Sequence, residues 1–188
     1  MDSHHKNKED LEREAGEVLR AQKNPAAFAP LYERYYEVLF RFFWNRTEDY
    51  DLSSDLTQHT FLKALRNLGS YQFRNLPFSA WLFRIGINEM NMYFRKAERE
   101  RIVPLDLTLL REWAGEEGID GYLEKEFTRV EKLILDLPPD QLALIELRFF
   151  EKKSFLEIGQ IMKISENNAK VKTYRVLDKI RKLMEEKE

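Results

Sequence analysis

Hydrophobic residues recur at steps of three and four along most of the chain, the spacing that places them on one side of an α-helix. The first such stretch covers 28–43 and follows Pro25, a residue favoured at helix starts. Its apolar stripe consists of Phe28, Leu31, Tyr32, Tyr35, Leu39, Phe42 and Phe43. Seven glycines and six prolines leave little room for an all-β fold. The pattern therefore predicts an all-α protein with an aromatic core.

Two more helices are expected in this part of the chain. One covers 51–68, and we expect Gly69 to end it in the left-handed C′ position. Its inward-facing residues would be Leu56, Thr60, Leu65 and Leu68. The other covers 79–101, where Trp81, Ile85 and Met92 would serve the core and the remaining face is polar and basic.

The C-terminal stretch 137–184 predicts a helix-turn-helix module. A helix opens at Pro138-Pro139, and Ser154 and Glu157 have the spacing of a capping box for a short second helix. Ser165 can cap a third helix. The residues that share one face of this third helix are Ala169, Thr173, Val176, Ile180 and Leu183. The module is thus expected to be a small domain of three packed helices.

The opposite face of that third helix is polar and basic. Its candidate DNA-contacting residues are Asn167, Asn168, Lys170, Lys172 and Arg175. Residues 154–184 hold seven Lys and Arg against three acids, a net +4 in a chain whose total is −2. If this face were only solvated, the positive charge would not need to be concentrated in this segment. The charge pattern therefore favours a polyanionic partner over a plain solvated surface.

The intervening segment 102–126 has a net charge of −5 and contains three of the seven glycines, so we interpret it as a linker. A short helix is possible within it, at 107–113. The expected organisation is an N-terminal tail at 1–24, a helical domain at 25–101, the linker, and the helix-turn-helix domain at 127–188.

Residue types that support catalysis are scarce. The chain has no Cys, and its three His include no pair at the spacing of a helical metal site. It also lacks a glycine-rich phosphate loop, so we expect no enzyme activity, no metal and no cofactor. The charged N-terminal segment predicts no export signal, and no apolar run approaches the roughly 20 residues of a membrane span. We therefore expect a cytoplasmic protein without membrane insertion.

An aromatic loop precedes the basic helix expected at 79–101. Tyr71, Phe73 and Phe78 lie in this region, and 71–101 has a net charge of +3. Aromatic platforms beside cations suit single-stranded DNA, since bases stack on the rings while cations follow the phosphates. Core packing of Phe78 and Trp81 is an equally weighted alternative.

Three groups of motifs follow one another along the chain. They are Asp55-Leu56-Thr57-Gln58-His59-Thr60-Phe61, then Phe73-Arg74 with Phe78-Ser79-Ala80-Trp81-Leu82-Phe83-Arg84-Ile85 and Asn88, and finally Leu137-Pro138-Pro139 through Ile164-Ser165 and Lys170. In this order they resemble bacterial RNA polymerase sigma factors of the extracytoplasmic-function group of the sigma-70 family. The resemblance covers about 25–100 and 125–184.

The resemblance implies a two-domain transcription initiation factor. Its first domain would bind core RNA polymerase through Asp55, Gln58 and Phe61. The same domain would recognise and open the minus-ten promoter element through Arg74, Asn75, Trp81, Arg84, Asn88, Arg95 and Lys96. The second domain would read the minus-thirty-five element as duplex through Asn167, Asn168, Lys170, Lys172 and Arg175. The family also suggests an anti-sigma protein as a further partner.

The chain departs from the family pattern at four positions: Lys163 replaces the usual Gly of the turn, Met92 a common Asp, Thr173 a core Leu, and Gly159 the usual Ala of the short helix. Two other interpretations remain open. A stand-alone helix-turn-helix regulator would depend on the C-terminal module and not on Asp55 or Gln58. A sigma-like decoy would bind polymerase or an inhibitor and would ignore DNA.

Overall fold

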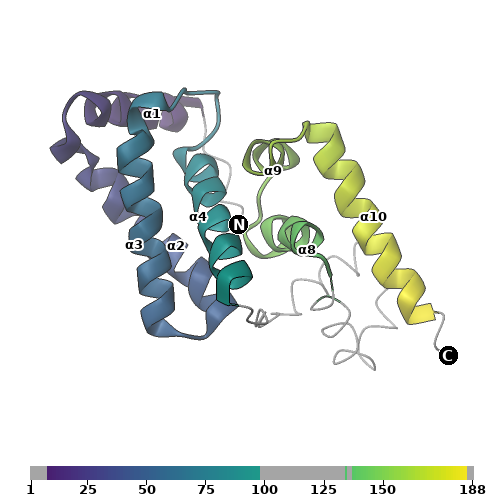
Figure 1. Cartoon of the computed structure of the whole chain (residues 1–188). Helices are drawn as coiled ribbons and strands as arrows, with labels where there is room; N and C mark the ends of the chain where they lie inside the picture. The colour runs from purple at the N-terminus through teal and green to yellow at the C-terminus, as the bar shows by residue number, and fades with distance from the viewer. Residues whose placement is uncertain (1–7, 98–133, 135–136, 186–188) are drawn as a thin grey trace. The chain divides into compact units, whose positions relative to one another are not determined.

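The computed structural model describes residues 8–97, 134 and 137–185, and all regular structure within these ranges is helical, as the sequence predicted (Figure 1). Contacts divide the chain into two compact units, 1–102 and 103–188. None of the described helices combines the length and the hydropathy that crossing a membrane demands. The linker expected at 102–126, with its short helix, lies outside the described residues.

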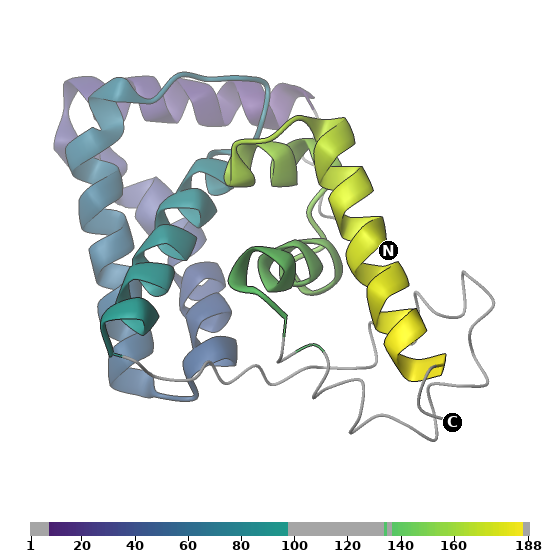
Figure 2. The same ribbon diagram turned by 45° about the vertical axis from the view of Figure 1, so that its right-hand side comes forward.

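In the first unit α3 packs against both α2 and α4, and α4 also contacts α2 (Figures 1 and 2). Its α-helices are α1 (Lys8–Lys23), α2 (Ala29–Thr47), α3 (Tyr50–Asn67) and α4 (Phe78–Ala97). Two short 3-10 helices, η1 (Pro25–Phe28) and η2 (Leu68–Ser70), follow α1 and α3. The three helices expected from the hydrophobic spacing are therefore present.

The prediction of an N-terminal tail at 1–24 is wrong for residues 8–23, because these residues form helix α1. Glu14, Val18 and Ala21 follow one another at steps of four and three and are all buried. Charged side chains occupy many other positions of α1, so the sequence does not reveal this buried face, which itself contains a carboxylate. The first unit thus includes a helix that precedes the expected domain.

The end of α3 also differs from expectation. Gly69 does not adopt a left-handed conformation; it lies in η2, and the backbone N–H of Tyr71 closes this turn by donating to the carbonyl of Leu68 at 3.0 Å. Leu56, Thr60 and Leu68 are buried as predicted, whereas Leu65 remains 37% exposed. Its position therefore belongs to the outer surface of α3.

Aromatic rings fill the centre of the first unit. Phe42 and Phe83 meet edge to face with ring centroids 4.9 Å apart, and Phe43 has no exposed surface. A Cβ at Gly86 would lie 2.9 Å from the Phe43 ring, so the close approach of α4 to α2 requires glycine at that position. The prediction of an aromatic core is confirmed for this stripe, with Tyr32 partly exposed.

The second unit contains α8 (Pro139–Ile145), the π-helical turn η3 (Glu146–Phe150), α9 (Phe155–Met162) and α10 (Glu166–Glu185). The capping box of Ser154 and Glu157 forms as predicted, and Ser165 accepts a hydrogen bond from the backbone N–H of Asn168 at 3.2 Å. The buried face of α10 includes Ala169, Thr173, Val176 and Ile180. The side chain of Leu183 is not among those that the structure describes.

Candidate nucleic-acid and protein interfaces

The turn between α9 and α10 fixes how the second unit presents its last helix. Lys163 ends α9 with a left-handed φ of 58°, and the carbonyl of Gly159 accepts hydrogen bonds from the N–H groups of Lys163 and Ile164. A Cβ on Gly159 would lie only 2.8 Å from the Ile164 carbonyl oxygen. Gly159 thereby allows the backbone after the turn to pass directly over α9.

The outer face of α10 displays all five residues predicted for duplex DNA. Asn167, Asn168, Lys170, Lys172 and Arg175 are exposed. The face also carries two exposed apolar side chains that the sequence analysis missed: Val171 is 37% exposed and Tyr174 is 43% exposed. They line a shallow hollow together with Asn167, Lys170, Arg175 and Asp178. The helical spacing of 167, 171, 174 and 178 was the signal that could have identified them.

Positive charge dominates this face. Apart from the residues already named, Lys179, Arg181 and Lys182 are exposed on α10, against the exposed acids Glu166 and Asp178. The Asp178 carboxylate pairs with the Lys182 ammonium at 3.2 Å, one helical turn further along. The charge of Lys182 is therefore partly neutralised by Asp178.

In the first unit, the segment 71–77 joins η2 to α4 and exposes a short tip. Phe73 is 38% exposed, Arg74 and Asn75 are exposed, and Asn75 takes a left-handed φ of 56°. This conformation turns the chain at the tip. The tip formed by Phe73, Arg74 and Asn75 thus presents one aromatic ring, one cation and one amide to solvent.

The floor of this loop is aromatic and largely buried. The Tyr71 ring meets Phe78 and Trp81 edge on, with centroids 5.3 Å and 5.2 Å apart. Phe78 has no exposed surface and Trp81 is 8% exposed. Both rings therefore occupy the core, which is the packing alternative weighed from the sequence, and Phe73 is the aromatic ring of the loop that is accessible to a base.

The polar edge of α4 continues from the loop. Arg84 is half-buried, and Asn88 and Arg95 are exposed on the same side of the helix, at steps of four and seven residues. The side chain of Lys96 lies outside the described ones, as do Arg99 and Arg101. Arg84, Asn88 and Arg95 form one track along α4 that begins beside the loop.

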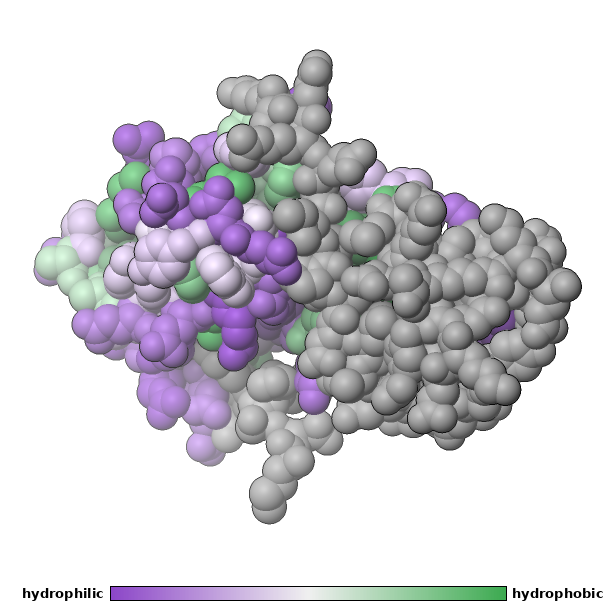
Figure 3. Space-filling model, turned by 90° about the horizontal axis from the view of Figure 1, so that it is seen from below, coloured by the Kyte–Doolittle hydropathy of each residue, from purple (hydrophilic) through white to green (hydrophobic). Residues whose placement is uncertain are grey.

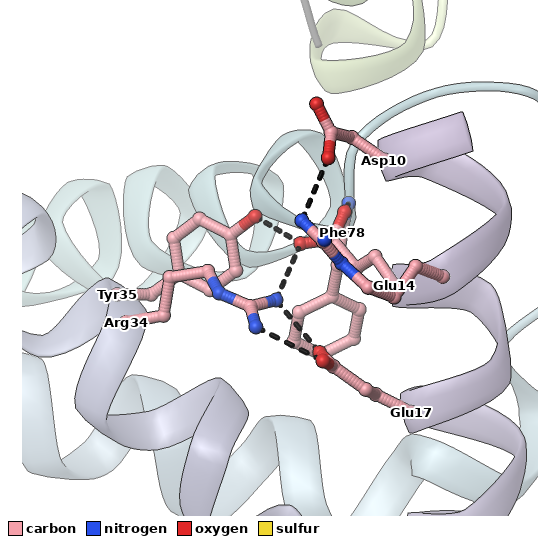
Figure 4. A network of polar contacts seen from close by, with 7 residues as sticks. Asp10, Glu14, Glu17, Arg34, Tyr35 and Phe78 are labelled. Atoms are coloured by element: carbon pink, nitrogen blue, oxygen red, sulfur yellow. Dashed lines mark hydrogen bonds and ion pairs between the residues drawn. The ribbon is translucent and has the colours of Figure 1, made fainter. Parts of the chain in front are cut away.

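A buried carboxylate lies behind the loop (Figure 4). Glu14 of α1 accepts hydrogen bonds from the Tyr35 hydroxyl and from the backbone N–H of Phe78, and Arg34 contacts it at 3.4 Å. Arg34 also binds Glu17 at 2.7 Å, and this hydrogen bond lowers the pKa of Glu17. Burial, with the nearby Glu14 charge, raises the pKa of the Tyr35 hydroxyl far above its usual value.

The outward side of α3 is a candidate protein interface. Asp55 and Gln58 are exposed, but Phe61 is only 4% exposed because its ring packs against Tyr32, with centroids 4.7 Å apart. Leu62 is 50% exposed beside them. Figure 3 looks onto the end where α3 begins and shows mainly hydrophilic surface with smaller apolar patches on the coloured part. Leu62, rather than Phe61, is thus the accessible apolar residue next to Asp55 and Gln58.

Comparisons with known families match both units. The family described as Sigma-70 region 2 matches residues 31–100, and that described as Sigma-70, region 4 matches residues 127–180. The chain belongs to the sigma-70 family. The region 2 match covers most of α2 and all of α3, the loop and α4, whereas α1 precedes it. The region 4 match contains the helix-turn-helix.

Similar proteins place the chain in the extracytoplasmic-function group of sigma factors. It is 29% identical over 170 residues to the ECF RNA polymerase sigma factor BldN of Streptomyces coelicolor, covering 89% of this chain and 64% of that protein. It is 27% identical to SigW and 26% identical to SigM of Bacillus subtilis, covering 83% and 81% of this chain and 88% and 92% of those proteins. The chain thus spans just under two thirds of BldN and most of SigW and SigM.

A solved structure supports the fold. CnrH, determined in complex with the cytosolic domain of CnrY, matches with a TM-score of 0.60 and 21% identity, over 93% of this sigma factor and 99% of CnrH. At this identity the likeness concerns the helical fold and not the contacts of individual residues.

Proposed function

We propose that this sigma factor binds core RNA polymerase in the cytoplasm and directs promoter-specific transcription initiation by recognising and opening promoter DNA. The observation that carries the proposal is the presence of both sigma-70 regions in one chain, in the family's order. A stand-alone DNA-binding regulator would need only the second of these regions.

The second unit would read duplex promoter DNA through α10. Asn167, Asn168 and Arg175 offer amide and guanidinium groups that pair with base edges in a major groove. Lys170 and Lys172 would neutralise phosphates. Val171 and Tyr174 extend this proposal, because exposed apolar groups beside the polar ones can contact thymine methyl groups.

The first unit would hold the opened minus-ten element. Phe73, Arg74 and Asn75 at the loop tip would receive an extruded base, while Arg84, Asn88 and Arg95 would follow the single strand along α4. Lys96 continues the same series in the sequence. Trp81 would act from the core, by supporting the loop, rather than by stacking on DNA.

Core polymerase would bind the outward side of α3. Asp55 and Gln58 supply the polar contacts, and Leu62 supplies the apolar contact that the sequence analysis assigned to Phe61. An anti-sigma protein, common for the family, is proposed as a second protein partner. Neither role requires a cofactor or a metal.

Complex formation with core RNA polymerase tests the proposal without knowledge of the promoter. Size-exclusion chromatography should show a complex for the wild-type chain and a weaker one for Asp55→Ala/Gln58→Ala. The matched control is Glu12→Ala/Gln72→Ala, which removes one exposed acid and one exposed amide elsewhere in the unit. No wild-type complex with active polymerase would overturn the proposal and favour a stand-alone regulator.

A second step separates a sigma factor from a decoy. The assembled complex should produce defined run-off transcripts from some fragments of a random DNA library, and core polymerase alone should not. Binding without such transcripts would identify a decoy and overturn the initiation role.

A further inference from the structure

Helix α1, outside the segment matched by the family, contacts both ends of the loop 71–77. We propose that α1 is a positioning element that holds this loop, through Gln22 and Glu14, in the shape needed to open promoter DNA. The inference rests on the proposed function for its consequence in transcription, and on the geometry of the first unit for the positioning itself.

Gln22 fixes the entry to the loop. Its side-chain amide nitrogen donates to the carbonyl of Leu68 at 2.9 Å and to the carbonyl of Tyr71 at 3.0 Å. These contacts join positions that are 46 and 49 residues apart in sequence. Both amide hydrogens of Gln22 are thus used by η2 and by the first residue of the loop.

Glu14 fixes the exit from the loop. One carboxylate oxygen accepts from the backbone N–H of Phe78 at 2.8 Å, where α4 begins. A negative charge is favourable at this end of a helix, because the first N–H groups lack partners within the helix. The Tyr35 hydroxyl and Arg34 hold the other carboxylate oxygen. The carboxylate is therefore locked in place by α2 as well.

The two anchors leave only the tip free to respond to DNA. Phe73, Arg74 and Asn75 are exposed, while the ring of Tyr71 is packed on Phe78 and Trp81. A short loop with both ends fixed has few conformations, so less ordering is needed when a base enters. Figure 2 shows α1 running beside the chain segment that joins α3 to α4.

Trypsin cleavage after Arg74 measures the positioning directly, because a protease needs local mobility at an exposed site. Glu14→Gln removes the charge and Gln22→Leu removes both amide hydrogens with little change in size. We expect each variant to be cut after Arg74 about tenfold faster than wild type. Glu12→Gln, which removes an exposed charge from the same helix, should be cut at the wild-type rate. Wild-type rates in both Glu14→Gln and Gln22→Leu would overturn the proposal.

Promoter opening measures the consequence. Holoenzyme assembled on a fragment transcribed by the wild-type protein would be probed with permanganate, which modifies unpaired thymines. Both variants should bind core polymerase as wild type does and open the fragment about tenfold less. On the same fragment pre-opened by mismatches, both variants should form the open complex as well as wild type does. A first unit that had merely lost its fold would lose polymerase binding and would show no such recovery.

The two assays separate the inference from the proposed function. If the wild-type chain binds no polymerase, the proposed function fails, and the trypsin rates still decide whether α1 holds the loop. If the variants are cut faster but open promoters as wild type does, the role of α1 in opening is overturned.

Discussion

The carbonyl of Gly159 accepts a hydrogen bond from the backbone N–H of Lys163, and Lys163 holds a left-handed φ of 58° to make it. This conformation costs a residue with a Cβ about 1–2 kcal/mol. The turn of the helix-turn-helix is therefore strained by a lysine where glycine would fit without strain.

Replacing Lys163 with glycine should stabilise the second unit. The relief of strain is partly offset by the greater freedom of glycine in the unfolded chain, which leaves a net gain of about 0.5–1 kcal/mol. Hydrogen exchange of the α9 and α10 amides in the full chain would report the change. Lys170→Gly, in the regular part of α10, is the control and should cost about 1 kcal/mol. A loss of protection in Lys163→Gly would contradict the strain argument.

Gly159→Ala should destabilise the same turn. Its Cβ would lie 2.8 Å from the Ile164 carbonyl oxygen and 3.2 Å from the Glu166 nitrogen, both backbone atoms that cannot rotate away. We expect a loss of about 1–2 kcal/mol despite the better helix propensity of alanine. The identical change Gly16→Ala in α1, where the nearest atom is the end of the Arg20 side chain at 3.7 Å, should be neutral or stabilising. Equal effects at the two glycines would contradict the prediction.

Tyr71 should give the first unit a specific sensitivity to alkali. Burial, and then the charge of Glu14, raises the pKa of Tyr71 to about 12 from its ordinary 10. Because the folded pKa is the higher one, the stabilising contribution is complete below pH 10 and is lost as the pH rises from 10 towards 12. Tyr71→Phe should therefore show a smaller drop of the urea midpoint over that window. The same drop in both proteins would exclude Tyr71 as the cause.

Much of this architecture follows from local rules in the sequence. The stripe from Phe28 to Phe43, the capping box of Ser154 and Glu157, and the inward face of α10 are short-range patterns. The capping box forms as predicted, the stripe is buried except at partly exposed Tyr32, and the described members of the α10 face are buried. The exposure of Asp55 and Gln58 also follows from helical spacing. These features depend on positions three or four residues apart, which a single sequence displays directly.

The remainder depends on contacts between distant parts of the chain. Glu14 looks like one of many surface acids in the sequence, and only its partners at Tyr35 and Phe78 make its burial possible. Phe61 belongs to the motif assigned to polymerase binding, yet it packs against Tyr32 of α2. Which of two neighbouring apolar residues faces the core is decided by the rotation of the helix against its neighbours, and helical spacing alone leaves that rotation open.

Lys172→Ala should weaken the binding of duplex DNA by the full chain regardless of sequence. Each phosphate neutralised releases condensed counterions, so the slope of log affinity against log salt should fall by about 1. Lys182→Ala, ten positions further along α10 and paired with Asp178, is the charge-matched control. Fluorescence anisotropy at several salt concentrations gives both slopes. An unchanged slope for Lys172→Ala would exclude its proposed phosphate contact.

Phe61 and Leu62 should separate folding from polymerase binding. Phe61 is 4% exposed, so Phe61→Leu should lower the free energy of unfolding of the first unit by about 1–2 kcal/mol and leave the polymerase affinity of the folded protein unchanged. Leu62 is 50% exposed, so Leu62→Ser should leave stability within about 0.5 kcal/mol and weaken the polymerase complex. Urea unfolding and titration against labelled core polymerase measure the two quantities. The opposite result would be weaker polymerase binding by folded, stable Phe61→Leu together with wild-type binding by Leu62→Ser. That result would show that Phe61 makes the polymerase contact, and it would require α3 to rotate when polymerase binds.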